Sequence, residues 1–266
     1  MLNLSRKSSS ELWIKRLRPA ARAQFRLFCF PSAGANAASY LPWSAAVSPH
    51  IEVFALQLPG RGERFREPPT AVMSEILEAL AQATRPLCDR PFVFFGHSLG
   101  ALIAFELTRA LRRESERLPL HLFVAARRAP QTPQVDPPVH QLPDQDFLSE
   151  LRRLGGMAPE ILAEQDFMEL LMPSLRADFA IHETYSYTPQ PPLACPITAC
   201  GGSNDPEVSP EDLAAWREQT ASQFELHIFP GGHFFVDAHR ERLIAMIETH
   251  FGLHSLPFNN QPGALA

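Results

Sequence analysis

The chain has 266 residues, of which 45% are hydrophobic and 20% charged, which is ordinary usage for a globular protein and indicates one core domain. Its formal net charge of −5 gives no reason to expect a nucleic-acid ligand. The N-terminus lacks the apolar core of a signal peptide, and no apolar run approaches the roughly 18 residues that cross a bilayer. We therefore expect a soluble, cytoplasmic monomer with no membrane partner.

Short apolar runs alternate with amphipathic stretches along the chain, a pattern typical of a parallel sheet with crossover helices. The runs are hydrophobic almost throughout, as in strands that are covered on both faces. Apolar residues at three-to-four spacing predict the helices between them. We expect strands at residues 25–30, 51–57, 92–95, 120–125, 197–200 and 224–229, and helices at 72–87, 99–111, from Ser209 onward, and at 236–249.

Residues 130–192 interrupt this alternation. The stretch is proline-rich at both ends and carries helical patterns at 146–154 and 166–179. A structureless loop of that length is improbable inside a compact domain, so we predict a helical insertion that sits over the sheet as a lid. The polar residues Asp178, His182 and Glu183 in it are interpreted as a solvated helix face.

The chain ends are expected to lie outside the core domain. Residues 1–20 are predicted to be a poorly ordered N-terminal extension, and residues 255–266 a C-terminal tail. The domain itself is expected to span residues 21–254.

One motif carries chemistry. Gly96-His97-Ser98-Leu99-Gly100 fits G-x-S-x-G, directly after an apolar strand and directly before an amphipathic helix. That context is typical of the nucleophile elbow of the α/β-hydrolase fold, in which a strained turn lifts the serine above the sheet. We therefore predict an α/β protein of this fold, with helices on both faces of a mostly parallel sheet and with Ser98 as nucleophile. His97 is interpreted as structural, because a neighbour on an elbow points away from the serine.

A serine nucleophile needs a base and an acid that orients the base, and in this fold they follow the serine in the order acid, then histidine. Asp205 comes after a predicted strand in a Gly/Asn/Pro turn, which makes it the favoured acid over Glu207 and Asp212. His233 follows the last strand in Pro230-Gly231-Gly232 and is the favoured base.

An oxyanion hole is expected from two backbone N–H groups. One is that of Leu99, directly after the nucleophile. The other is expected in the small-residue loop after the first core strand, at Ala33. The four cysteines lie in apolar contexts without metal-ligand spacing, and no phosphate-binding or dinucleotide motif is present, so neither a metal nor a cofactor is expected.

The residues also resemble a known family, the type II thioesterases of polyketide and nonribosomal peptide biosynthesis, from about Trp13 to Phe251. The segments that carry the resemblance are FCFPSAGANAASY, LQLPGRGERFREPP, FFGHSLGALIAFEL, AARRAP, LGGMAPEIL, DFAIHETYSY and FPGGHFF. One departure is Ser32-Ala33-Gly34-Ala35, where the family more often has an aromatic residue or histidine before Ala-Gly-Gly.

The resemblance implies a substrate and a partner. The substrate would be an acyl group held as a thioester on the phosphopantetheine arm of an acyl or peptidyl carrier protein, removed so that a stalled synthase can resume. Because such carriers are acidic, docking would need a local basic surface. The candidate arginines are Arg127, Arg128, Arg152 and Arg153 near the lid, and Arg61, Arg64 and Arg66 after the LPG segment.

Three alternatives stay open from the sequence. A general carboxylesterase would share the same triad, and a chain-releasing thioesterase for medium-chain acyl groups would add a long acyl tunnel. A noncatalytic module that binds carrier proteins is the alternative without enzymatic activity.

Overall fold

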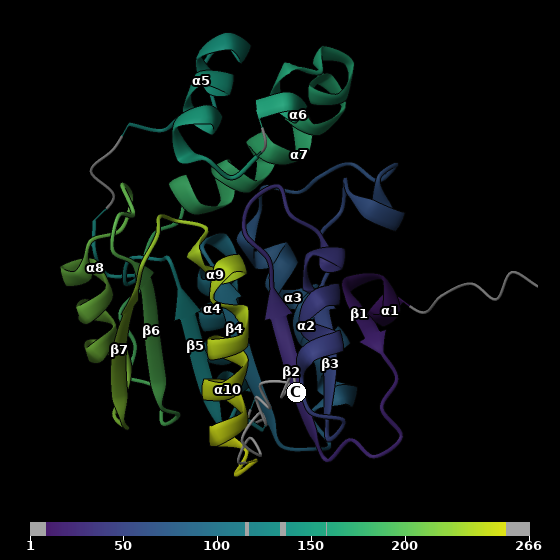
Figure 1. The fold of residues 1–266 in the computed structure, drawn as a ribbon, viewed down its shortest axis with the longest axis vertical. Helices are drawn as coiled ribbons and strands as arrows, with labels where there is room; N and C mark the ends of the chain where they lie inside the picture. The colour runs from purple at the N-terminus through teal and green to yellow at the C-terminus, as the bar shows by residue number, and fades with distance from the viewer. Residues whose placement is uncertain (1–8, 115–116, 134–136, 158, 254–266) are drawn as a thin grey trace, which may run out of the picture.

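The structure of the chain is a computed structural model that describes residues 9–114, 117–133, 137–157 and 159–253. Its centre is a seven-stranded sheet in the order β1-β3-β2-β4-β5-β6-β7 (Figure 1). All pairs are parallel except β1 with β3. The strands are β1 (Ile14–Arg18), β2 (Phe25–Phe30), β3 (Ile51–Leu56), β4 (Phe92–His97), β5 (His121–Ala125), β6 (Ile197–Gly202) and β7 (Phe224–Phe229). The six predicted strands and the mostly parallel sheet are confirmed.

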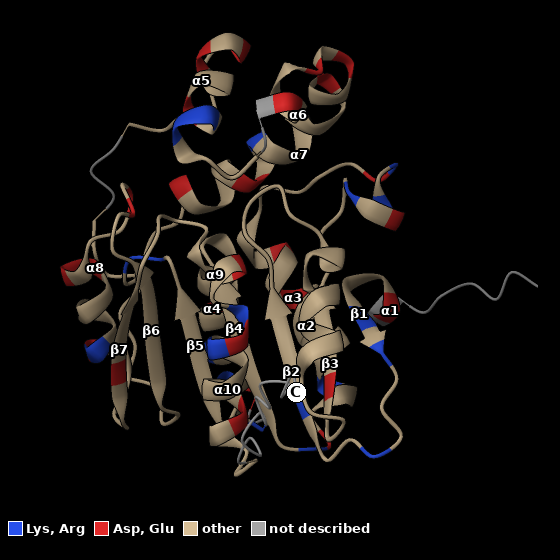
Figure 2. Ribbon diagram, in the orientation of Figure 1, with Lys and Arg blue, Asp and Glu red and all other residues tan. Residues whose placement is uncertain are grey.

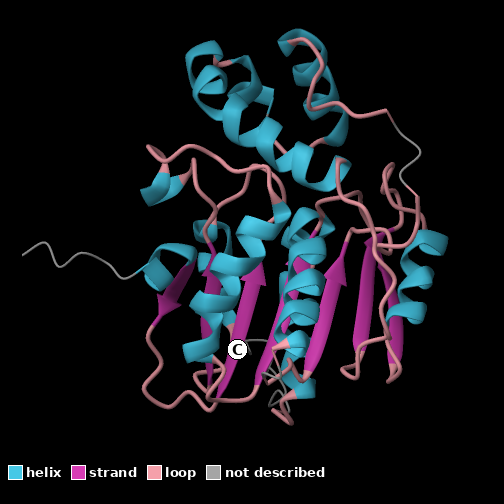
Figure 3. Cartoon of the chain, turned by 180° about the vertical axis from the view of Figure 1, so that it is seen from behind, coloured by secondary structure: helices cyan, strands magenta, loops and turns pink. Residues whose placement is uncertain are grey.

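Helices cover both faces of the sheet (Figures 1 and 3). On one face α3 (Met73–Thr84), α4 (Leu99–Arg113) and α8 (Pro210–Ala214) pack against strand residues such as Phe28 and Phe94. On the other face, α2 (Leu41–Ala46), α9 (Phe235–Ala238) and α10 (Arg240–His250) cover the alternate strand residues, among them Phe95 and Phe123. Burial on both faces explains why the central strands read as continuous apolar runs. The short helices η1 (Ala37–Tyr40), η2 (Gly62–Arg64), η3 (Arg85–Leu87) and η4 (Ala215–Gln219) lie in the connections.

The N-terminal region differs from the prediction. Part of the predicted extension forms helix α1 (Ser9–Trp13) and strand β1, which pairs antiparallel with β3 at the edge of the sheet. The expectation of a poorly ordered extension up to residue 20 is therefore wrong for these residues. The segment IKRLR has three basic residues and only Ile14 is buried, so its composition does not distinguish an edge strand from an exposed tail. Residues 1–8 and 255–266 of the predicted termini lie outside the described residues.

The connection between β5 and β6 carries helices α5 (Asp144–Leu154), α6 (Pro159–Ala163) and α7 (Gln165–Glu183). They lie beyond the carboxyl ends of the parallel strands, above the sheet in Figure 1. The α5–α7 segment has its own small apolar core, which includes Phe147, Met168, Leu175 and Phe179. It is thus a packed unit placed at the edge of the sheet where the loops after β2, β4, β6 and β7 also meet.

Candidate active site

Ser98 sits in a strained turn between β4 and α4. Its backbone has φ 54° and ψ −116°, which is unusual for a residue with a side chain. The turn is possible because the flanking positions are glycine. A Cβ at Gly100 would lie 1.9 Å from the carbonyl oxygen of Phe30, and one at Gly96 would lie 2.4 Å from the Cα of Ala101. The glycines of the motif therefore allow helix and strands to approach so closely that Ser98 stands at the strand end.

His233 links Ser98 to Asp205. It lies in the loop after β7, and its Nε2 is 2.9 Å from the Oγ of Ser98. Its Nδ1 is 2.9 Å from the Oδ2 of Asp205, whose side chain is fully buried. The other carboxylate oxygen of Asp205 accepts a hydrogen bond of 2.9 Å from the N–H of Glu207. The structure thus brings together the three residues expected to act as nucleophile, base and acid, although they lie far apart along the chain.

The rival acids take other roles. Asp212 forms a capping box with Ser209 at the start of α8, as first-turn helix chemistry predicts. Glu207 forms an ion pair of 2.7 Å with Arg153 of α5. Of the two carboxylates, neither contacts His233.

His97 holds the backbone of His233 through a hydrogen bond. Its Nε2–H donates to the carbonyl oxygen of His233 at 2.9 Å, and the two rings are 5.6 Å apart. Burial lowers the pKa of His97 to about 3, so the ring is neutral and can only act as a fixed donor. The structural interpretation of His97 agrees with this geometry.

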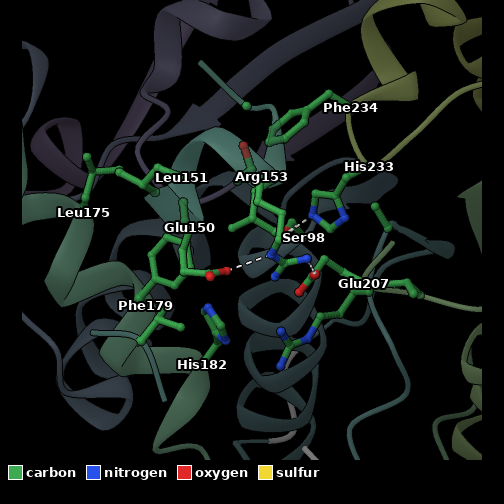
Figure 4. A pocket seen from close by; sticks show the side chains of 18 of the residues that line it. Ser98, Glu150, Leu151, Arg153, Leu175, Phe179, His182, Glu207, His233 and Phe234 are labelled. Atoms are coloured by element: carbon green, nitrogen blue, oxygen red, sulfur yellow. Dashed lines mark hydrogen bonds and ion pairs between the residues drawn. The ribbon is translucent and has the colours of Figure 1, made fainter. Parts of the chain in front are cut away.

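A pocket opens in front of Ser98, with a cavity volume of about 140 Å³. Its apolar wall comes mainly from the α5–α7 segment, through Leu151, Leu154, Leu175 and Phe179. Figure 4 shows Ser98 and His233 on one side, with Phe179 and His182 across from them. Ala33 also lines this pocket, on the loop after β2. A largely apolar chamber that ends at a hydroxyl within hydrogen-bond distance of a histidine is suited to acyl transfer.

A family model described as Thioesterase domain matches residues 25–251, which is most of the chain. The chain belongs to the thioesterase family.

Relatives of this thioesterase include proteins named for biosynthetic pathways. It is 44% identical over 224 residues to the gramicidin S biosynthesis protein GrsT of Aneurinibacillus migulanus, with 84% of this chain and 88% of the relative covered. It is 38% identical over 242 residues to the thioesterase PikA5 of Streptomyces venezuelae, with 91% and 86% covered. Its fold matches the type II thioesterase BorB from the borrelidin biosynthetic cluster with a TM-score of 0.84 at 38% identity, with 92% and 99% covered. These findings confirm the resemblance to type II thioesterases, the α/β-hydrolase fold and the prediction of an enzyme that acts on thioesters.

In this thioesterase, helix α7 is tied to two loops of the core by a buried ion pair. Asp178 of α7 is 1% exposed and receives two hydrogen bonds from the guanidinium of Arg61, at 2.6 and 2.7 Å. The same carboxylate accepts a hydrogen bond of 2.8 Å from the N–H of Gly34 in the loop after β2. Ser174 adds a hydrogen bond of 2.8 Å to the carbonyl oxygen of Gly60. Neither Arg61 nor Asp178 was predicted to have this role.

Two sequence interpretations are corrected by these contacts. Asp178 and Glu183 are not a solvated face, because Asp178 is buried in the ion pair and Glu183 accepts hydrogen bonds from the N–H groups of residues 139 and 140. Arg61 and Arg64 are buried, and Arg64 pairs with Glu67 and lies over the ring of Trp13. These two arginines are therefore not available for docking.

The cysteines form neither a disulfide nor a metal site in the described part of the chain. Cys29, Cys88, Cys195 and Cys200 are free and buried, as expected. Within the part of the chain that the structure describes, no group of histidine, cysteine and acidic side chains could hold a metal ion. None of the described helices has the length and apolar character needed to span a membrane.

Proposed function

We propose that this thioesterase hydrolyses acyl groups held as thioesters on the phosphopantetheine arm of carrier proteins in a polyketide or nonribosomal peptide assembly line. The observation that carries the proposal is the position of His233 between Ser98 and Asp205, with both contacts at 2.9 Å. The family and the relatives described above support the substrate class.

Ser98 is the nucleophile in the proposed reaction. Its Oγ attacks the thioester carbonyl while the Nε2 of His233 takes the hydroxyl proton. The thiol of the arm leaves with the proton that His233 returns, and an acyl-serine remains. A water molecule, deprotonated by His233, then attacks the acyl-serine and releases the free acid. Asp205 holds the Nδ1–H of the imidazole, so that Nε2 is the nitrogen that accepts the proton.

The oxyanion is assigned to the N–H groups of Leu99 and Ala33. In the loop after β2, the N–H of Gly34 is occupied by Asp178 and that of Ala35 by the carbonyl oxygen of Ser32. Among the described residues, the N–H of Ala33 has no partner, and Ala33 lines the pocket next to Ser98. This supports Ala33 over Gly34 and Ala35. A donor in such a position contributes about 3 kcal/mol to stabilisation of the transition state.

We assign the α5–α7 segment as the lid of the site. It supplies most of the apolar wall of the pocket and lies over the strand ends that carry Ser98 and His233. Its role would be to bind the acyl chain and to exclude bulk water from the reacting carbonyl.

The carrier protein is expected to dock near the inner end of α5. The outer ends of the segment are acidic, since α5, α6 and α7 begin with Asp144, Asp146, Glu160 and Asp166. Figure 2 shows these acidic tips and the basic inner end of α5, which is formed by Arg152 and Arg153. An acidic carrier would be repelled by the tips and attracted to the inner end. Substitution of Arg152 should then reduce turnover of carrier-bound substrate more than hydrolysis of a small ester, and equal effects on both would contradict docking there.

The experiment that tests the function compares three substrates with the same short acyl group. One carries it on a phosphopantetheinylated carrier protein, one on a small free thiol and one as a simple ester, with Ser98→Ala as the blank. We expect the highest kcat/KM with the carrier and no turnover by the variant. Equal or faster hydrolysis of the simple ester would mean a general carboxylesterase. Preference for a long acyl chain would mean a chain-releasing enzyme, and binding of carrier without hydrolysis would mean a noncatalytic module.

A further inference from the structure

The acyl pocket is not uniformly apolar, because its lining includes six charged residues. Three are carboxylates, and each is already engaged. Glu150 and Glu207 both bind Arg153, at 2.7 Å in each case. Glu183 accepts hydrogen bonds from the N–H groups of residues 139 and 140, and it also contacts the Nδ1 of His140. Each carboxylate of the pocket thus already has partners within the protein.

Arg127 differs from these residues because no carboxylate neutralises it. Among the described residues, its side chain has no ion-pair or hydrogen-bond partner, and its Nε is buried without an acceptor. Burial and the neighbouring Arg128 lower its pKa to about 10, and it is therefore still a cation at neutral pH. A buried N–H without an acceptor is costly, and a cation with such a group in a pocket is a candidate for ligand binding.

The backbone around Arg127 is held in an unusual conformation. The preceding Ala126 has φ 49°, and its N–H donates to the carbonyl oxygen of Cys200 at 2.8 Å. The carbonyl oxygen of Arg127 itself accepts a hydrogen bond of 2.7 Å from the indole of Trp216. Left-handed backbone at a residue other than glycine is strained and persists where the surrounding structure holds it. The turn therefore fixes the direction in which Arg127 leaves the end of β5.

His182 provides a second unpartnered group on the neighbouring wall. It lies on α7 beside Phe179, with ring centroids 5.2 Å apart (Figure 4). Its Nδ1 is buried and has no hydrogen-bond partner among the described residues. Burial and the positive charge of Arg127 hold the pKa of His182 well below its ordinary value, so the ring is neutral. The two residues line one pocket, and together they offer a cation and an imidazole without an acceptor from the protein.

We propose that Arg127, assisted by His182, binds a carboxylate at the far end of the acyl group, so that the pocket selects dicarboxylic acyl groups held through one thioester. This inference rests on the proposed function and adds the substrate class. A carboxylate supplies the acceptor that Arg127 lacks within the protein, and its two oxygens match the fork of a guanidinium. An aliphatic acyl chain would leave the buried Nε–H of Arg127 without an acceptor.

The test uses thioesters of a small thiol, so that it does not depend on carrier docking. Each dicarboxylic acyl group is paired with a neutral one of the same shape, in which an isopropyl group replaces the carboxylate. Malonyl is paired with isovaleryl, succinyl with 4-methylpentanoyl, and glutaryl with 5-methylhexanoyl. We expect kcat/KM to favour the dicarboxylic member of at least one pair by about tenfold or more, the range of a hydrogen bond to a charged group. If none of the three pairs shows a preference for the dicarboxylic member, the proposal is overturned.

Arg127→Met tests the assignment to this residue. The substitution leaves the backbone hydrogen bond from Trp216 possible, and it should reduce the preference for the dicarboxylic member to about one. Arg113→Met is the matched control, because Arg113 is exposed on α4, does not line the pocket and carries the same charge. If Arg127→Met lowers both members of a pair equally, Arg127 is structural and the proposal fails.

A second measurement covers the case in which Arg127→Met does not fold. Free succinate and glutarate are tested on the unaltered enzyme as competitive inhibitors of a small neutral ester, against the matched monocarboxylic acids. Stronger inhibition by the dicarboxylates supports the proposal, and equal inhibition contradicts it. If the small ester and the thioesters are hydrolysed but the carrier is not preferred, the proposed function fails. The comparison of dicarboxylic and neutral acyl groups still decides this inference.

Discussion

The carboxylate of Asp205 is held at both oxygens, one by His233 and one by the N–H of Glu207. Asp205→Asn should keep this geometry but offer an amide N–H to Nδ1, which favours the wrong tautomer of His233. We expect kcat to fall by about 10⁴-fold with little change in stability. Steady-state kinetics and thermal unfolding measure both. Glu207→Gln is the control, because its side chain does not touch His233, and a similar loss of kcat in that variant would contradict the role of Asp205.

Gly100 is required by space rather than by backbone conformation. A methyl group there would lie 1.9 Å from the carbonyl oxygen of Phe30, which is backbone and cannot rotate away. Gly100→Ala should therefore destabilise the fold by about 3 kcal/mol or more, in the range of strong overpacking. Gly155→Ala is the matched control, since a Cβ there meets nothing within 4 Å and the cost comes from its φ of 72° alone, about 1 kcal/mol. Denaturant unfolding compares them, and equal losses would show that the close approach is not a constraint.

At the scale of elements, α7 is held on the core by the Arg61–Asp178 ion pair. Asp178→Ala would leave the guanidinium of Arg61 buried without its partner and release the N–H of Gly34. We expect a loss of about 3–5 kcal/mol in the free energy of unfolding, since a broken buried pair leaves an uncompensated charge. The kcat should also fall more than KM rises, because Gly34 adjoins the proposed oxyanion donor Ala33.

Two further variants separate these effects. Asp178→Asn retains an oxygen acceptor for Gly34, so it should recover part of the lost kcat. Arg153→Ala breaks exposed ion pairs to Glu150 and Glu207. It should lower the free energy of unfolding by about 1 kcal/mol or less. If Asp178→Ala is no less stable than Arg153→Ala, the buried pair does not hold α7 in place.

The ion pair also marks the limit of what the sequence could predict. The central strands and the elbow were predictable because apolar runs and G-x-S-x-G are local patterns. Arg61 and Asp178 are 117 positions apart, and nothing local distinguishes them from charges on a solvated surface. Strand β1 was missed for a related reason. Three of its five residues are basic, as in an exposed tail, and only pairing with β3 makes it a strand.

For the whole molecule, the order of the strands assembles the site. Ser98, Asp205 and His233 follow β4, β6 and β7, and these parallel strands end at the same edge of the sheet. The sequence predicts these three residues because the chain order of nucleophile, acid and base is a property of the fold. The pocket is lined by the α5–α7 segment together with loops of the core, and no periodic pattern specifies how they pack. Arg127 follows β5 and His182 lies on α7, so only the structure brings the two residues to one pocket.

The folded protein should lose stability in mild acid because buried histidines are kept neutral. Burial lowers the pKa of His97 and of His121 from 6.5 to about 3. Between these values the unfolded chain binds protons that the folded chain does not, so the stabilisation is complete above pH 6.5 and is lost as the pH falls. For each histidine we expect a decrease of about 1.6 kcal/mol in the free energy of unfolding between pH 6.5 and about 5. Urea unfolding at several pH values measures it.

His121→Gln isolates one contribution. Glutamine can still donate to the Oγ1 of Thr198, which the Nε2 of His121 contacts at 2.7 Å, but it does not titrate. In the variant, the free energy of unfolding should fall less between pH 6.5 and about 5. The difference should be about the 1.6 kcal/mol expected for one histidine. Carboxylates do not obscure the comparison in this window, because groups such as Glu67, whose pKa is lowered by Arg64, take up protons only at lower pH. An unchanged slope in His121→Gln would mean that His121 is protonated in the folded state, and that burial against His250 does not exclude its charge.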